Sequence, residues 1–200
     1  MDLEQLRAEI ASGDPSRSMP ALARLREATA EQAEPLLLLG LQQNPFLVRS
    51  LSCAGLGMKP TPAGWEALVA ALETDEDSNV RAEAANALVS HSLERAWPLL
   101  RLAFARDDQW LVRCSILSAM AEHPAMAAAD LLELARLALG DADGTVRVGG
   151  AEILGRLVRE GGSDSAGASA AAAEARAELV RLQHDSDHRV VAAALNGLQG

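Results

Sequence analysis

The sequence predicts an all-α fold, an α-solenoid of about six stacked helix pairs. Composition is the first observation behind this prediction: 49% of the 200 residues are hydrophobic, only 2% are aromatic, and Tyr is absent. The apolar residues are mostly Ala and Leu, which are strong helix formers, whereas β-branched and aromatic residues favour strands. The second observation is a motif that recurs along the chain at nearly constant spacing, which is typical of repeat architectures.

The first helix pair is expected within residues 1–29 and is degenerate. Residues 3–11 predict its first helix and residues 17–28 its second. Terminal units of a repeat array are atypical because they cap an open stack. Thr29 and Gln32 then form the Thr-x-x-Gln pattern of a capping box, which predicts the start of the next helix.

Four regular units follow, at residues 30–60, 61–91, 92–124 and 125–160. Each contains a Val-Arg pair, and the pairs recur at spacings of 32, 32 and 34 residues: Val48-Arg49, Val80-Arg81, Val112-Arg113 and Val146-Arg147. An Asp precedes the Val by five residues in all but the first unit, and Leu or Met follows it by eight residues in every unit. These aligned columns predict one structural module that is repeated in tandem.

The unit at residues 61–91 has the pattern of two amphipathic helices. Its first apolar stripe has i, i+3, i+4 spacing and consists of Ala67, Leu68, Ala71 and Leu72. Its second stripe has the same spacing and consists of Val80, Ala84, Ala87 and Leu88. The polar segment 74–79 between them is rich in residues that favour helix N-caps. A first helix, a short turn and a second helix are therefore predicted for each unit.

The C-terminal part interrupts the regular spacing. Residues 161–169 are almost entirely Gly, Ser and Ala, and this composition predicts a flexible loop. Residues 170–200 then predict a C-terminal repeat, with Val190 in the Val column. Because neighbouring units share one core, residues 1–200 are expected to form a single repeat domain.

Charge and composition exclude several classes of partner and location. There are 28 acidic and 18 basic side chains, giving a formal net charge of −10, and no dense basic cluster offsets it. We therefore expect no binding to nucleic acid. No apolar run approaches the ~20 residues that span a bilayer, so no membrane insertion is expected. The acidic N-terminus and the two widely spaced cysteines predict a cytoplasmic protein.

The motif Asp-x-x-x-x-Val-Arg, followed by an Ala-rich helix, resembles a HEAT repeat. More narrowly, residues 77–88 (DSNVRAEAANAL) resemble the HEAT-like repeats of phycobilisome lyases and related cyanobacterial proteins. Residues 107–113 and 141–152 are similar. The resemblance covers roughly residues 31–200 and implies a solenoid of HEAT-like helix pairs.

The resemblance implies a ladder of charged side chains that joins successive units. In HEAT repeats the Asp of the turn and the Arg after the Val form such a ladder. Carried over by position, its members are Asp75, Asp107, Asp141 and Asp185 with Arg49, Arg81, Arg113 and Arg147. Partly buried charges require such pairing. Gln43 and Val191 depart from the pattern, so the ladder is expected to fade at both ends.

The resemblance also implies a protein-interaction scaffold or chaperone-like adaptor, with a phycobiliprotein as its partner. The alternatives within the resembling group are a bilin lyase or lyase subunit and a partner in iron–sulfur cluster assembly. The sequence contains no phosphate loop, no Gly-x-Ser-x-Gly and no HExxH, so we favour a binding protein over an enzyme and expect no metal or cofactor. Cys114, near the start of a predicted second helix, is the one candidate ligand thiol.

The candidate partner-binding surface is the face formed by the second helices, which usually line the concave side of such solenoids. Counting from the Val column gives its predicted residues: Glu83, Asn86, Ser90, Ser115, Ser118, Glu122, Gly149, Glu152 and Arg156. In the first regular unit the same columns hold Leu51, Ala54 and Met58. Gly150 aligns with a core Ala and is explained by close packing, whereas Gly149 aligns with a surface position and suggests a shallow slot.

Overall fold

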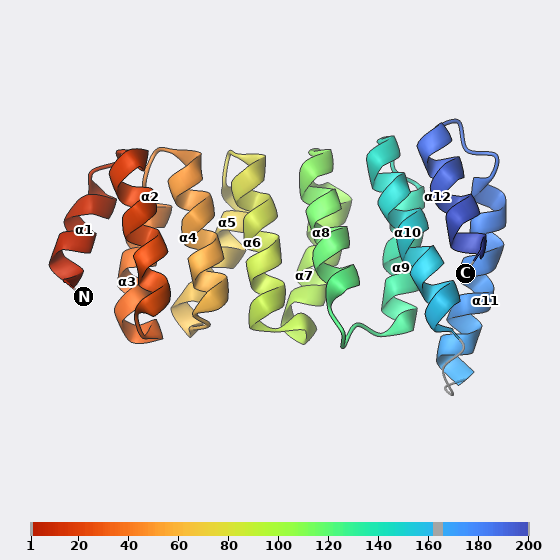
Figure 1. Ribbon diagram of the computed structural model, residues 1–200, viewed down its shortest axis with the longest axis horizontal. Helices are drawn as coiled ribbons and strands as arrows, with labels where there is room; N and C mark the ends of the chain where they lie inside the picture. Colours follow the sequence, from red (N-terminus) through yellow and green to blue (C-terminus); the bar gives the residue numbers. More distant parts are fainter. Residues whose placement is uncertain (1, 162–165, 200) are drawn as a thin grey trace. The chain divides into compact units, whose positions relative to one another are not determined.

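The computed structural model describes residues 2–161 and 166–199, apart from the side chains of residues 166–169. These residues form twelve α-helices and one short 3-10 helix, with no β-strand in the described part of the chain (Figure 1). The helices follow one another as α1 (Leu3–Ala11), α2 (Pro15–Arg24), η1 (Leu25–Glu27), α3 (Ala30–Leu41), α4 (Phe46–Met58), α5 (Pro62–Thr74), α6 (Ser78–His91), α7 (Leu93–Arg106), α8 (Trp110–Glu122), α9 (Ala128–Leu139), α10 (Gly144–Glu160), α11 (Ala166–Leu182) and α12 (His188–Gln199). The chain is an α-solenoid, as the sequence predicted.

The chain divides into two compact units, Met1–Ile116 and Leu117–Gly200. The single repeat domain expected over residues 1–200 stays a prediction. In the N-terminal unit the odd-numbered first helices and even-numbered second helices form two layers. In each unit the second helices pack more closely on one another than the first helices do.

The core follows the columns of the repeat. The five Val side chains of the Val column are fully buried: Val48, Val80, Val112, Val146 and Val190. A corresponding first-helix column is also buried and consists of Leu36, Leu68, Leu100 and Leu134. Each module therefore buries one stripe from each of its two helices against the neighbouring modules. The hydrophobic effect acts on the same positions in every module, which explains why the columns are visible in the sequence.

Two equivalent close approaches bring neighbouring second helices together. In the N-terminal unit a Cβ added to Gly57 of α4 would lie 2.9 Å from the Cβ of Ala87 in α6. In the C-terminal unit a Cβ added to Gly155 of α10 would lie 2.9 Å from the Cα of Gly197 in α12. Gly57 and Gly155 both stand nine residues after the Val of their repeat. A small residue here sets how closely second helices can pack.

Three helix boundaries differ from the sequence expectations. Helix α2 ends at Arg24, and the 3-10 helix η1 occupies Leu25–Glu27 of the expected segment 17–28. Helix α2 begins at Pro15, two residues earlier than expected, because Asp14 caps it and Pro is favoured in the first turn. Helix α11 begins at Ala166, so the end of the expected loop 161–169 is helical. The run of Ala after residue 167 explains this, since Ala has the highest helix propensity. Residues 162–165 of that loop lie outside the described residues.

None of the helices in the described part of the chain has both the length and the apolar character required to cross a membrane.

Candidate functional site

The turns between first and second helices are built from acidic side chains that hold the backbone. Asp77 caps α6 by accepting from the Asn79 N–H at 2.8 Å, as Ser, Thr, Asp and Asn commonly do at helix starts. Asp75, two residues earlier, accepts from the Asp77 N–H at 2.9 Å. Asp141 and Asp143 repeat this arrangement before α10, with a distance of 2.8 Å. The Asp-x-Asp sequence therefore holds the turn in one conformation. In Asp75 this orients the carboxylate toward Arg49 of the preceding repeat.

Three rungs of the charged ladder join consecutive repeats. In each rung an arginine donates two hydrogen bonds, from Nε and Nη2, to the carboxylate of an Asp in the next repeat. The distances are 2.8 and 3.0 Å for Arg49–Asp75 and 2.7 and 3.0 Å for Arg81–Asp107. They are 3.0 and 2.9 Å for Arg147–Asp185. Each arginine also donates through Nη1 to the backbone of its own turn, as Arg81 does to the Asp75 oxygen at 3.0 Å. Arg113 donates in the same way to the Asp107 oxygen at 2.7 Å. The ladder residues are thus engaged in holding the stack together.

The ladder shifts the protonation equilibria of its members. The hydrogen bonds that Arg49 donates to the Asp75 carboxylate raise the pKa of the Arg49 guanidinium. Burial alone would raise the pKa of Asp107, but the bonds from Arg81 and from the Gln109 N–H outweigh it and the pKa is lowered. The bond from Arg147 lowers the pKa of Asp185. All three groups are charged at neutral pH, as bidentate arginine–carboxylate pairs require.

In the N-terminal unit the predicted second-helix residues form a polar strip. Glu83, Asn86 and Ser90 lie on α6, and Ser115 lies on the neighbouring helix α8. The Ser115 hydroxyl lies 3.2 Å from the Asn86 side-chain oxygen, which links the two repeats. Partial burial raises the pKa of the Glu83 carboxyl. Ser90 is exposed and the other three are half-buried, so the strip is accessible and held in place.

In the C-terminal unit the remaining predicted residues lie on α8 and α10. Ser118, Glu122 and Glu152 are exposed, and Arg156 pairs with Glu160 at 2.8 Å one turn along α10. The slot expected at Gly149 is absent, because the Leu117 side chain covers this glycine and an added Cβ would lie 2.9 Å from the Leu117 Cδ1. Gly150 meets the Cβ of Ala138 at the same distance of 2.9 Å, which agrees with its expected role in close packing.

An apolar pocket lies on the second-helix side of the N-terminal unit. Its volume is about 190 Å³, and its walls include Leu51, Ala54 and Met58 of α4, which occupy the predicted surface columns of the first regular unit. Leu25 also lines the pocket, and Met58 is 58% exposed. Lys59 closes one end by donating to the backbone oxygens of two residues in the preceding unit, at 2.7 and 3.0 Å. This pocket has room for one large apolar side chain of a partner.

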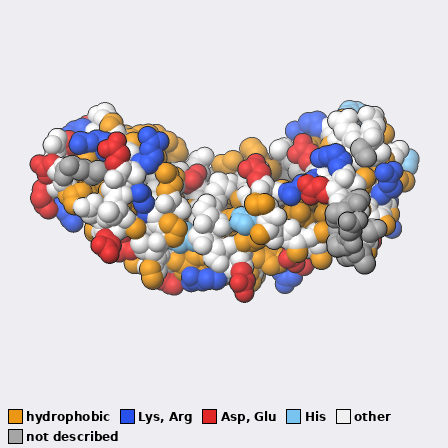
Figure 2. Space-filling view, turned by 60° about the horizontal axis from the view of Figure 1, so that its bottom comes forward, with side chains coloured by type: hydrophobic (Ala, Val, Ile, Leu, Met, Phe, Trp, Pro, Cys, Tyr) orange, Lys and Arg blue, Asp and Glu red, His pale blue; other side chains and the backbone are white. Residues whose placement is uncertain are grey.

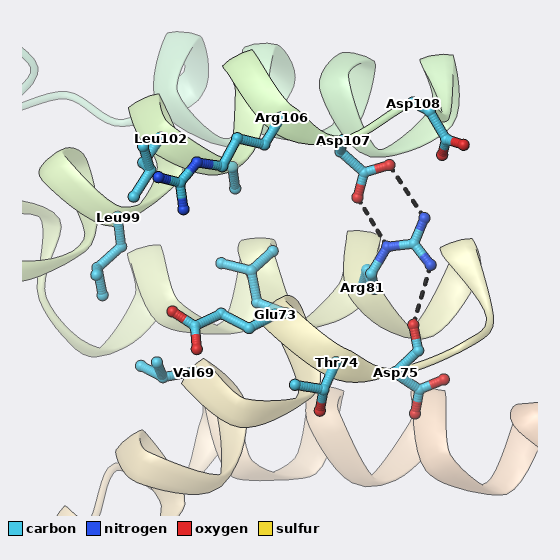
Figure 3. Close-up of a pocket in the computed structure, with 12 residues that line it drawn as sticks. Val69, Glu73, Thr74, Asp75, Arg81, Leu99, Leu102, Arg106, Asp107 and Asp108 are labelled. Atoms are coloured by element: carbon cyan, nitrogen blue, oxygen red, sulfur yellow. Dashed lines mark hydrogen bonds and ion pairs between the residues drawn. The ribbon is translucent and has the colours of Figure 1, made fainter.

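A larger cleft lies between the first helices α5 and α7, in the other layer of the N-terminal unit (Figure 3). Its volume is about 750 Å³. Val69 and Glu73 on α5 face Leu102 and Arg106 on α7 across it. None of these residues was predicted from the sequence to line a binding surface. A signal was available, because Leu99, Leu102 and Arg106 recur at i, i+3 and i+7 beside the buried stripe of the same helix.

Charge is mixed on the visible surface of the N-terminal unit. At the left of Figure 2, basic and acidic side chains are interspersed with apolar ones, and neither sign dominates. This distribution offers no continuous basic strip to a phosphate backbone on that face.

The two cysteines have different environments. Cys53 of α4 is buried, and burial raises the pKa of its thiol to about 12. Cys114, the candidate ligand thiol, is half-buried in α8. Across the described residues, no group of three or more His, Cys, Asp and Glu side chains is placed to hold a metal ion.

Comparison with known proteins gives the same architecture. Residues 34–121 match the family model described as HEAT repeats. The match supports a HEAT-repeat protein. The matched range contains two ladder rungs, Arg49–Asp75 and Arg81–Asp107, and the cleft between α5 and α7. No curated protein matches the chain. HEAT repeats generally mediate interactions between proteins, so the match suggests a protein-interaction scaffold.

Proposed function

We propose that this HEAT-repeat chain is a protein-interaction scaffold whose second-helix face docks a partner protein. The observation that carries the proposal is the apolar pocket between α2 and α4 beside the polar strip on α6 and α8. An apolar centre with polar surroundings is the usual anatomy of a protein interface. A partner would place one apolar side chain among Leu51, Ala54 and Met58 and make polar contacts with Glu83 and Asn86.

The rigidity of this surface supports a docking role. The ladder holds α4 and α6 in register through Arg49–Asp75, and Ser115 ties α8 to Asn86. A surface that is already ordered loses little conformational entropy when a partner binds. Hot-spot residues also tend to fill well-packed pockets near the centre of an interface.

Partner capture by pocket variants tests the proposal. Met58→Glu places a charge over the apolar pocket and should abolish capture of the protein that the unaltered chain retains from the native organism. Leu137→Glu is the matched control, since Leu137 is 39% exposed on the first helix α9. Circular dichroism establishes that both variants are folded. Undiminished capture by Met58→Glu, or equal loss with both variants, refutes docking at this pocket.

The candidate partner is a phycobiliprotein, which would place the chain in the cytoplasm. This finer proposal is supported by the resemblance of residues 77–88 to the HEAT-like repeats of phycobilisome lyases. It predicts co-purification of a chromophore-bearing protein with visible absorbance. Transfer of bilin by the purified chain would indicate the lyase alternative, and loss of the partner in Cys114→Ser alone would indicate iron–sulfur cluster assembly.

A further inference from the structure

The cleft between α5 and α7 has the dimensions of a helix-binding groove. At the end where both helices begin, the guanidinium of Arg95 lies 3.9 Å above the ring of Trp65 and bridges α7 to α5. At the other end, the Arg81–Asp107 ion pair closes the cleft (Figure 3). The lining runs from Val69 to Thr74 on α5 and from Leu99 to Arg106 on α7, about two helical turns or roughly 10 Å at 1.5 Å per residue. The volume of about 750 Å³ lies in the range of ~300–1,000 Å³ typical of binding clefts.

The walls present apolar side chains to this space. Val69 comes from α5, and Leu99 and Leu102 come from successive turns of α7. Leu102 is 45% exposed, so its side chain is accessible to an occupant of the cleft. Apolar anchors one turn apart match the i, i+3, i+4 spacing by which an amphipathic helix lies in a groove.

Opposite charges mark the two walls. Glu73 is exposed on the α5 wall and Arg106 is exposed on the α7 wall, and Figure 3 shows both side chains beside the apolar residues. Neither forms an ion pair with any residue that the structure describes, in contrast to Asp75, Arg81 and Asp107 at the closed end. The cleft therefore offers an occupant one carboxylate on the α5 wall and one guanidinium on the α7 wall, each beside apolar residues.

We propose that the cleft between α5 and α7 docks an amphipathic α-helix of a partner protein. The occupant carries an apolar stripe that contacts Val69, Leu99 and Leu102. A basic residue of the occupant faces Glu73, and an acidic residue on its other flank faces Arg106. The complementarity of charge on the two walls selects this occupant over a uniformly charged or purely apolar segment.

This docking site is independent of the second-helix pocket. The cleft lies in the first-helix layer, whereas Met58 and its pocket belong to the second-helix layer of the same unit. With both surfaces occupied, the N-terminal unit would hold two partners at once. Failure of either proposal leaves the other standing, because different variants test them.

Binding of synthetic helices tests the proposal. Two helix-stapled peptides of about 14 residues, which span the groove when helical, share one apolar stripe. The matched peptide places Lys on the flank that faces Glu73 and Glu on the flank that faces Arg106, and the swapped peptide interchanges them. Each peptide is also synthesised with its sequence reversed, because a helix that lies in the groove in the opposite direction exchanges its two flanks. Binding of every peptide to the full chain is measured by fluorescence polarisation. The matched peptide should bind about three- to tenfold more tightly than the swapped one.

Variants of the walls give the decisive comparison. The double variant Glu73→Arg, Arg106→Glu should reverse the preference and bind the swapped peptide more tightly. Leu102→Glu should weaken the matched peptide about tenfold or more. Val180→Glu, at a 52% exposed position of α11, and Met58→Glu should leave its binding unchanged.

The outcomes are distinct. Absence of peptide binding, equal affinity for both peptides, or no reversal in the double variant overturns the proposal. Loss of binding in Met58→Glu instead of Leu102→Glu would also overturn it, because the peptide would then occupy the second-helix pocket. Glu73 and Arg106 are exposed, so the charge-reversed chain is expected to fold and the test does not depend on Leu102→Glu alone.

Discussion

At the scale of single residues, Arg81 shows why the repeat keeps an arginine after its valine. The side chain donates to the Asp107 carboxylate of the next turn at 2.7 and 3.0 Å and to the Asp75 backbone oxygen of its own turn at 3.0 Å. Lysine lacks the planar fork that serves both acceptors. The Arg81 side chain thus stabilises the turn of its own repeat, through Asp75, and the turn of the next repeat, through Asp107.

Removal of this side chain should be costly. We predict that Arg81→Ala lowers the free energy of unfolding by about 2–3 kcal/mol, because the Asp107 carboxylate, 9% exposed, loses its partner. Urea denaturation followed by circular dichroism measures the loss. Arg156→Ala is the control, since its pair with Glu160 is an exposed i, i+4 contact worth about 0.3–0.5 kcal/mol. Equal losses in the two variants would show that the rung contributes no more than a surface pair.

The same rung predicts how stability depends on pH. The folded-state pKa of Asp107 lies below its ordinary value of 3.8, so the folded state disfavours protonation. Its contribution to stability is therefore present above 3.8 and is lost as the pH falls below that value. Asp107→Asn should show a shallower loss of stability with acidification than the unaltered chain, measured as urea midpoints from neutral to acidic pH. If the urea midpoints of the two chains fell in parallel with pH, Asp107 would not be the source of the acid sensitivity.

At the scale of the helix, α10 shows how two adjacent glycines can differ. An added Cβ at Gly150 meets the Ala138 Cβ at 2.9 Å and the Ala135 backbone oxygen at 3.1 Å, neither of which can move away. An added Cβ at Gly149 meets only the end of the Leu117 side chain, also at 2.9 Å. Both positions gain helix propensity on replacement by Ala, by about 1 kcal/mol. Replacement by Ala should therefore destabilise the chain at Gly150 but not at Gly149.

We predict that Gly150→Ala destabilises the chain by about 1–2 kcal/mol because overpacking of α9 against α10 exceeds the gain in propensity. Gly149→Ala should leave stability unchanged or raise it by up to about 1 kcal/mol, since Leu117 can adjust its rotamer. Thermal and urea unfolding of the two single variants measure the difference. Destabilisation of similar size at both positions would mean that Leu117 is fixed and that the two glycines are equivalent.

At the scale of the whole chain, the sequence predicted what recurs and missed what depends on the fit between repeats. Val80 and Leu68 stand in columns, so their burial could be read from the spacing of the motif. The cleft between α5 and α7 could not, because it depends on how far apart neighbouring first helices stand. That separation depends on contacts between neighbouring repeats, such as Ser115 of α8 with Asn86 of α6 in the other layer, which no single repeat encodes. The cover that Leu117 places over Gly149 is likewise a contact between units of the repeat.

The ladder also predicts where energetic coupling begins and ends along the chain. Arg49 binds the Asp75 carboxylate and Arg81 binds the Asp75 backbone oxygen, so adjacent rungs share a residue. Arg147 bonds to Asp185 and to its own turn, and it shares no partner with Arg49. A quasi-one-dimensional stack couples nearest neighbours only. Losses of stability should therefore add for distant rungs and fail to add for adjacent ones.

We predict that the double variant Arg49→Ala, Arg147→Ala loses the sum of the two single losses to within about 0.5 kcal/mol. The double variant Arg49→Ala, Arg81→Ala should depart from its sum by about 1 kcal/mol, because the first substitution already loosens the turn that the second one needs. Urea denaturation of the singles and doubles measures both cycles under one set of conditions. Additive losses of unfolding free energy in both cycles would mean that Asp75 does not couple the adjacent rungs. Non-additivity of similar size in both cycles would mean that coupling is not limited to neighbouring repeats.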